Sequence, residues 1–227
     1  MINLPKKVLI FAAHQDDETI GCGGTIKLMS NSGSKVHICF MTNGETGIEQ
    51  NSDGSNITQT RMKEAKLAGK VLGAFEVSSF DIACQQLSND ITTFHKVIKK
   101  IRTVKPELVI THSNICKHRD HKITTDIVQE ACWKASENIL DQLGKVHTVS
   151  DLWSFEILDL HQNPDFVINI SETYKSKIEA MNVYLSQTGI LNDITSFIDG
   201  LSKVRGYSIN VNRGEAFTRL SRTPIQI

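Results

Sequence analysis

Short apolar runs alternate with amphipathic segments along the first two thirds of the chain. Nearly unbroken apolar runs predict strands covered on both faces of a parallel sheet. These strands are expected at 8–13, 36–42, 77–82 and 108–111. Apolar residues spaced three and four apart predict helices between them. These helices are expected at 19–30, 59–72, 90–104 and 123–135.

The pattern loosens after Gly144 but still predicts strands and helices. The strands are expected at 152–158 and 166–170, and the helices at 174–185 and 194–201, before a polar C-terminal segment. Alternating strands and helices predict βαβ crossovers, whose right-handedness places helices on both faces of the sheet. We therefore expect a three-layer α/β/α, Rossmann-like fold with a mostly parallel sheet. We expect a single domain over 1–227, with a core at about 6–145 that 146–227 completes.

Composition and charge argue against several classes of protein. Lys and Arg together number 25, as do Asp and Glu, so the formal net charge is zero and a nucleic-acid partner is not expected. No apolar run approaches the roughly 20 residues of a membrane span, and the first apolar stretch suits a strand better than a signal peptide. Five cysteines without a Cys-x-x-Cys pair favour free thiols and a cytoplasmic protein.

Histidines and carboxylates follow two of the expected strands. Residues 14–18, His-Gln-Asp-Asp-Glu, follow the first strand, and residues 118–121, His-Arg-Asp-His, follow the fourth. In such sheets the site lies beyond the carboxyl ends of the strands, where the two segments can meet. Acidic residues are also common at the start of a helix without any metal, because they interact favourably with the positive end of the helix dipole. The two segments together nevertheless indicate a metal site.

The residue types in these segments favour zinc or a similar divalent cation. A catalytic zinc keeps three protein ligands and an open position for water. His14 and Asp17 lie three residues apart across a loop-to-helix junction, and His121 could supply the third ligand. Two imidazoles and one carboxylate also accept Fe²⁺, Co²⁺ or Mn²⁺. Asp16 then remains as a free carboxylate beside the metal, which suits a general base.

These segments resemble the signatures of the PIG-L/LmbE-like N-deacetylases. Residues 13–18 are similar to the family's Ala-His-Pro-Asp-Asp-Glu, and 118–121 to its His-x-Asp-His. Weaker likenesses occur, in order, at 42–47, 61–64, 72–73, 184–187, 205–206 and 214–217. Gln15 and Arg119 stand where Pro is common in the family, so both loops are expected to be freer. Cys116 stands where many relatives have Asp.

The resemblance implies an LmbE-like fold and a zinc-dependent enzyme. The implied reaction removes acetyl from an N-acetylated amino sugar, usually an N-acetylglucosaminyl compound. By position, His14, Asp17 and His121 match the family's metal ligands. Asp16 matches its general base.

The resemblance also implies roles for residues around the metal. His118 matches the histidine that faces the tetrahedral intermediate, and Asp120 could raise its pKa and favour the imidazolium. The ordinary alternative for Asp120 is a helix N-cap. Arg61 is expected to pair with Asp120 or contact substrate, with a solvated surface position as its alternative. Glu45 and His112, near the ends of the second and fourth strands, are expected to shape the pocket.

Two other interpretations stay open at this stage. An amidase acting on a thiol conjugate or another non-sugar N-acyl group would use the same chemistry. A non-catalytic nucleotide- or sugar-binding module fits less well, because the glycines miss the Gly-x-Gly-x-x-Gly spacing. Gly21, Gly23 and Gly24 are instead expected to allow close helix–sheet packing. The acceptor sugar, the native metal and a homo-oligomeric state stay open.

Overall fold

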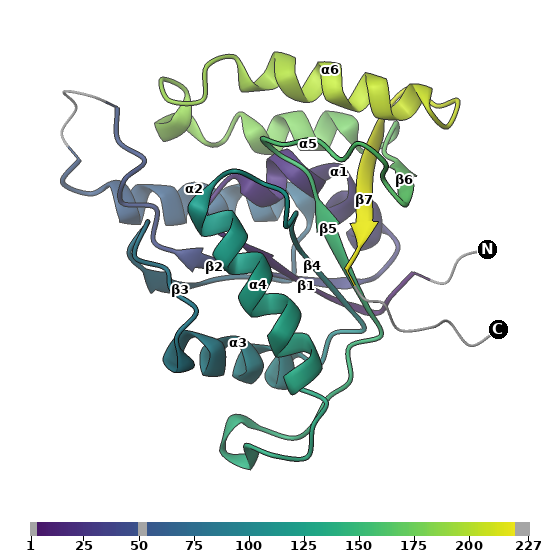
Figure 1. Ribbon diagram of the computed structural model, residues 1–227. Coiled ribbons are helices and arrows are strands. Elements are labelled where there is room, and N and C mark those ends of the chain that lie inside the picture. The colour runs from purple at the N-terminus through teal and green to yellow at the C-terminus, as the bar shows by residue number, and fades with distance from the viewer. Residues whose placement is uncertain (1–3, 50–53, 221–227) are drawn as a thin grey trace.

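A seven-stranded sheet forms the centre of the computed structural model, which describes residues 4–49 and 54–220. Its strand order is β3-β2-β1-β4-β5-β7-β6 (Figure 1). The strands are β1 (Lys7–Ala12), β2 (Lys35–Thr42), β3 (Glu76–Ile82), β4 (Leu108–His112), β5 (Asp151–Phe155), β6 (Phe166–Asn169) and β7 (Gly214–Arg219). The pairings among β1–β5 are parallel, whereas β7 pairs antiparallel with β5 and β6.

Helices cover both faces of this sheet (Figure 1). On one face lie α1 (Asp17–Asn31), α2 (Ile57–Leu72), α5 (Tyr174–Met181) and α6 (Ile194–Tyr207), and on the other lie α3 (Ile91–Val104) and α4 (Arg119–Lys134). Successive side chains of β1 serve the two layers in turn. Ile10 packs in the cluster with α1 and α2, and Leu9 in the cluster with α3 and α4. The expected three-layer α/β fold is confirmed.

The strand register brings the predicted site segments to one edge of the sheet. β1 lies between β2 and β4, with Ala12 opposite Phe40 and Ile10 opposite Ile110. The loops that follow β1, β2 and β4 therefore emerge side by side. Within the part of the chain that the structure describes, no helix is both long enough and apolar enough to span a membrane.

The expected polar C-terminal segment is wrong for residues 214–219, which form β7. Side chains alternate along a strand, so Glu215 and Phe217 point to the same face. Both are buried in the layer of α1 and α6. A charged residue at an inward position hides the apolar alternation by which a strand is recognised. Residues 221–227 lie outside the described part of the chain, and the single-domain assignment stays a prediction.

Glycines let α1 lie directly against its neighbours. A Cβ atom at Gly21 would lie 2.2 Å from the Phe155 ring, and one at Gly24 would lie 2.8 Å from the Ile170 side chain. Neither distance is compatible with a side chain, so the expected close packing is confirmed for these two positions. Between them, Cys22 departs from helical geometry with φ −145° and ψ 23°, and α1 is kinked there.

A buried ion pair replaces the backbone hydrogen bonds that α1 lacks at this kink. In a regular helix the Gly24 N–H would donate to the Ile20 carbonyl. Here the N–H groups of Gly24 and Thr25 donate to the Glu215 carboxylate, at 2.9 and 2.7 Å. The Lys177 ammonium donates to the Ile20 carbonyl at 2.8 Å and to Glu215 at 2.6 Å. The pair therefore fixes α1 to α5 and β7.

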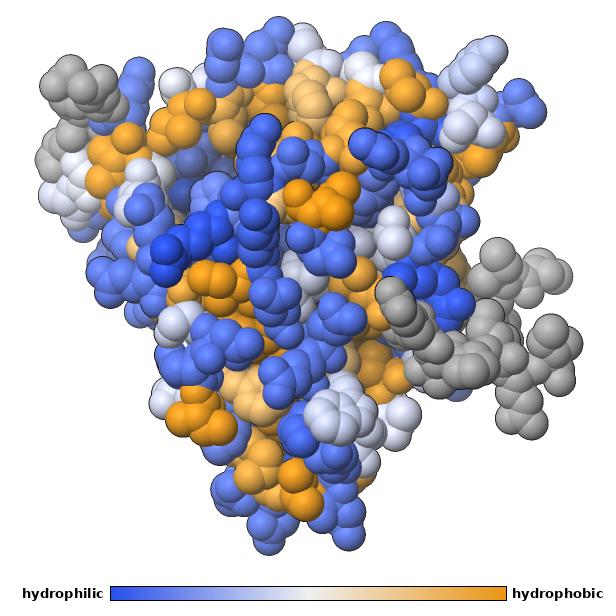
Figure 2. Space-filling model, viewed as in Figure 1, coloured by the Kyte–Doolittle hydropathy of each residue, from blue (hydrophilic) through white to orange (hydrophobic). Residues whose placement is uncertain are grey.

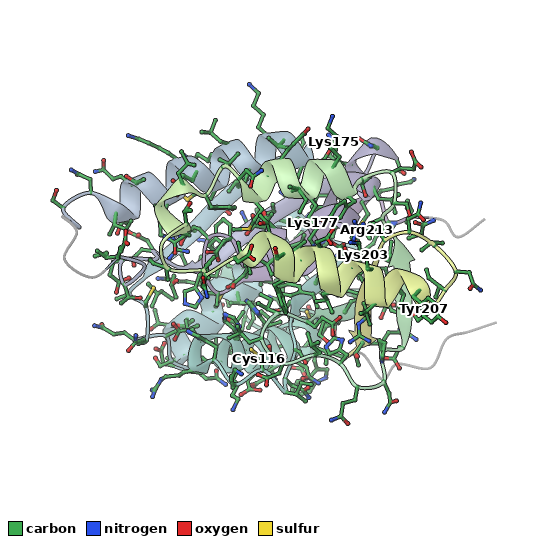
Figure 3. All side chains as sticks on the ribbon, turned by 90° about the horizontal axis from the view of Figure 1, so that it is seen from above. Cys116, Lys175, Lys177, Lys203, Tyr207 and Arg213 are labelled. Atoms are coloured by element: carbon green, nitrogen blue, oxygen red, sulfur yellow. The ribbon has the colours of Figure 1, made fainter. Side chains whose placement is uncertain are left out.

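Replacing Glu215 by Ala should lower the free energy of unfolding by about 3–5 kcal/mol, because the Lys177 ammonium stays buried without its partner. Urea denaturation measures this change. The matched control is Glu179→Ala, which removes the exposed partner of Lys175, another lysine of α5 (Figure 3). An exposed pair of this kind contributes less than about 1 kcal/mol. Equal losses in the two variants would contradict the role given to the buried pair.

Candidate active site

A pocket of about 500 Å³ opens where the loops after β1 and β4 meet. His14, Asp16 and Asp17 line it from the start of α1, and His118 and His121 line it from the start of α4. Two segments that are a hundred residues apart in the sequence thus form the bottom of one pocket. These five side chains are called the floor of the pocket. Figure 2 shows the surface hollowed above the N-terminal end of α4.

The carboxylate of Asp17 is the centre of this floor. Its Oδ2 atom lies 3.2 Å from His14 Nδ1, 3.3 Å from His121 Nε2 and 3.4 Å from His112 Nε2. It also accepts the backbone N–H of His14 at 2.7 Å. Burial would raise the pKa of Asp17, but the charge of His121 and its hydrogen bond hold that pKa well below its usual value. Asp17 is therefore ionised.

Two of the three imidazoles that approach Asp17, those of His14 and His121, also contact a second side chain through their other ring nitrogen. His14 Nε2 donates to Asp120 Oδ2 at 3.0 Å, and His121 Nδ1 lies 3.1 Å from Cys116 Sγ. Burial opposes protonation of both rings, but Asp120 and Asp17 raise the pKa of His14, and Asp17 raises that of His121 to about 9. A histidine with one nitrogen anchored and the other turned to a shared point is typical of metal ligands.

His112 supports the floor from beneath. Its Nε2 accepts the Ala13 backbone N–H at 2.8 Å, so the lone pair on that nitrogen is already used. Its ring stacks on His121 with centroids 3.9 Å apart. Burial and the charge of His121 lower the pKa of His112 to about 3. It therefore shapes the site as a neutral ring behind the pocket wall.

Asp16 has a strained backbone and a buried carboxylate. Its φ of 122° is rare for a residue with a side chain, and such strain often occurs at functional sites. Its Oδ2 pairs with Arg61 Nη2 at 3.1 Å, and Arg61 also donates to the carbonyls of Gln15 and Gly44. Burial raises the pKa of Asp16 to about 7, although Arg61 opposes this. Arg61 thus pairs inward with Asp16, and not with Asp120 as expected.

Asp120 raises the pKa of His118, as expected, but too weakly to favour the imidazolium. The Asp120 carboxylate binds His14 and accepts the Gln85 backbone N–H at 2.9 Å. Burial and the charges of His121 and His14 lower the pKa of His118, and these effects outweigh Asp120. His118 is also the N-cap of α4 and accepts the Asp120 backbone N–H at 3.2 Å.

Two further expectations are corrected by hydrogen bonds within the loops. Glu45 lines a neighbouring hollow and not the active-site pocket. Both its carboxylate oxygens lie 2.9 Å from the Cys84 N–H, so it joins the loop after β2 to the loop after β3. Gln15 is buried and donates to the Thr42 carbonyl at 2.9 Å. This bond ties its loop to the end of β2 instead of leaving it freer. Arg119 is the first residue of α4, a position that also suits Pro.

No role was expected for residues 184–187, which follow α5. Their sequence, Tyr-Leu-Ser-Gln, is one of the weaker family likenesses and could have drawn attention to them. The Tyr184 hydroxyl donates to Glu18 at 2.6 Å. Ser186 donates to Glu64 through its N–H at 2.9 Å and its hydroxyl at 2.6 Å. Gln187 lines the pocket. The segment therefore closes one side of the site against α1 and α2.

The described residues contain three groups whose potential ligand atoms lie within 4.8 Å of one another. The groups are His14–His118–His121, Asp17–His112–His121 and His14–Cys84–Asp120. His14 and His121 each occur twice, and His112 has no free Nε2 lone pair. The third ligand beside His14 and His121 is then Asp17 or His118. This set of imidazole and carboxylate donors fits zinc and other borderline divalent cations.

Comparisons with known proteins agree with this geometry. Residues 9–132 match the family described as PIG-L: GlcNAc-PI de-N-acetylase. The chain is 27% identical over 192 residues to the probable N-acetyl-alpha-D-glucosaminyl L-malate deacetylase 2 of Bacillus cereus, covering 82% of this chain and 85% of that protein. It is 26% identical over 197 residues to the 4-oxalmesaconate hydratase of Pseudomonas putida, covering 82% and 76%.

A solved structure shows the same fold. The N,N'-diacetylchitobiose deacetylase from Pyrococcus horikoshii aligns with a TM-score of 0.87 and 23% identity, over 99% of this chain and 91% of that chain. The family match includes both signature segments and more than half of the residues. The chain belongs to the PIG-L family, as the resemblance of these segments predicts.

Proposed function

We propose that this protein is a metal-dependent hydrolase that removes the acetyl group from an N-acetylated amino sugar and releases acetate and a free amine. One observation carries the proposal. The Asp17 carboxylate brings His14 and His121 within 3.3 Å of one oxygen, while Asp16 lines the same pocket as a separate carboxylate. That arrangement supplies both a cation site and a base, which hydrolysis of an unreactive amide requires.

We assign His14, Asp17 and His121 to hold the cation, with Zn²⁺ as the best fit and Fe²⁺, Co²⁺ or Mn²⁺ as other fits. A cation in this position would polarise the acetyl carbonyl and lower the pKa of water. Asp120 and Cys116 orient the two histidine rings through their other nitrogens. Asp17 is preferred to His118 because its Oδ2 contacts both histidines.

Asp16 and His118 are assigned to the proton transfers and to the developing negative charge. Asp16, with its pKa near 7, takes a proton from the attacking water and returns it to the departing amine. His118 Nδ1 already accepts the Asp120 N–H, so a neutral ring carries its proton on Nε2. His118 can therefore donate a hydrogen bond to the oxyanion without being an imidazolium.

The likeness to 4-oxalmesaconate hydratase supports a second candidate, a hydratase with a carboxylate substrate. Among the described residues that line the pocket, Arg61 is the only Arg or Lys, and it is paired with Asp16. Apart from the proposed cation, a carboxylate substrate would find little free positive charge there, so deacetylation is favoured. An amidase acting on a non-sugar or thiol-conjugate N-acyl group would use the same residues.

The direct test incubates metal-replete protein with a methyl glycoside of N-acetylglucosamine. Acetate and primary amine should appear in equal amounts, because one amide bond is hydrolysed in each turnover. Treatment with a chelator should remove the activity, and added Zn²⁺ should restore it. Turnover of an N-acyl substrate that lacks a sugar, together with no turnover of the glycoside, would favour the amidase.

Substitutions at the two neighbouring aspartates should separate base from ligand. Asp16→Asn should keep the metal and lose most of kcat, because an amide cannot accept the proton. Asp17→Asn should lose metal affinity, because it removes a charged ligand. Metal content by elemental analysis and steady-state kinetics measure both effects. Greater metal loss in Asp16→Asn than in Asp17→Asn would show that the two assignments are reversed.

His118→Ala should fold normally, retain the metal and slow the chemical step by ~10²–10³-fold, the usual effect of removing one oxyanion donor. Melting temperature, metal content and kcat are measured on the same preparations. Loss of the metal would make His118 the third ligand in place of Asp17.

The Arg61→Gln substitution should move the acidic limb of the kcat–pH profile to higher pH. Activity falls as pH decreases through the pKa of Asp16, since its protonated form cannot act as a base. The Arg61 guanidinium lowers that pKa, so its removal raises the pKa. The profiles are compared with the same metal bound and with melting temperatures as a control. An unchanged limb would mean that another group controls it.

A further inference from the structure

The walls of the active-site pocket differ in polarity. Polar groups come from the β2–α2 loop, from α2 and from the segment after α5, and they are Thr46, Gly47, Arg61 and Gln187. Apolar side chains come from the β5–β6 connection, the α5–α6 connection and α6, and they are Ile157, Leu158, Ile190, Leu191, Ile194 and Phe197. Asn192 of the α5–α6 connection is a polar residue among them. Figure 2 shows hydrophobic residues along the upper edge of the molecule, over α6 and the connection before it.

The apolar wall continues from the floor of the pocket to the solvent. Ile20, one turn after Asp17, is only 5% exposed, whereas Leu158, Ile190 and Phe197 at the mouth are 48, 39 and 38% exposed. Single exposed hydrophobic residues are common on protein surfaces. A contiguous apolar surface inside a pocket is different, because a ligand that covers it gains the hydrophobic free energy.

Charged groups hold this wall in place. Arg205 of α6 donates to both carboxylate oxygens of Glu156, at 2.7 Å each, and to the His161 carbonyl. These bonds join α6 to the β5–β6 connection, which contributes Ile157 and Leu158. The Asp193 side chain caps α6 beside Ile194. A wall anchored in this way is formed before the ligand arrives, so less ordering accompanies binding.

We propose that the substrate is an N-acetylated amino sugar whose aglycone is a hydrophobic alkyl or aryl group, and that this group lies on the apolar wall. The proposal rests on the deacetylation proposed above. Acetyl contributes one methyl group, and the floor where its carbonyl reacts is built from histidines and aspartates. The group that covers the wall therefore belongs to the amine part of the substrate. The sugar hydroxyls face the polar wall.

The test compares kcat/KM for acetate release from the hexyl and methyl glycosides of N-acetylglucosamine. The hexyl glycoside should react at least about tenfold better, since each buried methylene can contribute up to about fourfold. In the double variant Leu158→Ser/Ile190→Ser, the hexyl-to-methyl ratio should fall toward one. The matched control is Leu67→Ser on α2, which changes a residue that is 56% exposed and absent from the pocket lining. Its ratio should equal that of the unmodified protein.

The outcomes distinguish this inference from the proposed function. Acetate release with a hexyl-to-methyl ratio near one would overturn the inference and leave deacetylation standing. A methyl glycoside whose N-hexanoyl form reacts faster than its N-acetyl form would place the apolar group on the acyl side, which also overturns the inference. No acetate from either glycoside would overturn both. An unchanged ratio in the Leu158/Ile190 variant would show that another surface binds the hexyl group.

Discussion

The buried charge of Asp17 is the interaction on which the site depends. Three imidazoles approach one of its oxygens, and two of them stack on each other. Protonated rings of His14 and His121 at such distances repel each other in a medium of low polarity, so an ionised carboxylate between them is needed to keep the cluster together. The same carboxylate is suited to bind a cation. Attraction between oppositely charged groups thus preforms the site for the metal.

The position of Asp17 is set by residues far along the chain. Asp17 begins α1, and the kink in that helix is held by Lys177 and Glu215. Tyr184 binds Glu18, the residue next to Asp17. The last third of the chain therefore orients the first site segment in addition to forming one wall of the pocket. This explains why the weak likenesses at 184–187 and 214–217 occur together with the signature segments.

The sequence predicts the strands and helices up to residue 135 well, because their apolar runs and spacings report burial on both faces of a sheet. It also predicts which segments share the pocket, since parallel strands bring their ends together. It does not predict which side chains pair. Asp120 is two residues from His118 but binds His14, and Arg61 pairs with Asp16 instead of Asp120. Such pairings depend on side-chain directions and on loops such as that of Gln15. β7 is missed for a related reason, since its inward Glu215 binds backbone groups of α1.

The backbone of Asp16 has a consequence for how the enzyme responds to stabilising selection. Its left-handed φ of 122° disfavours any residue with a side chain, and its carboxylate is buried beside two other acidic residues. Glycine at this position would relieve the backbone strain and the repulsion between carboxylates, but it would leave the buried Arg61 guanidinium without its anion. Stabilising selection would therefore favour glycine at position 16 only together with a neutral residue at position 61. That double change would remove the group assigned as the base.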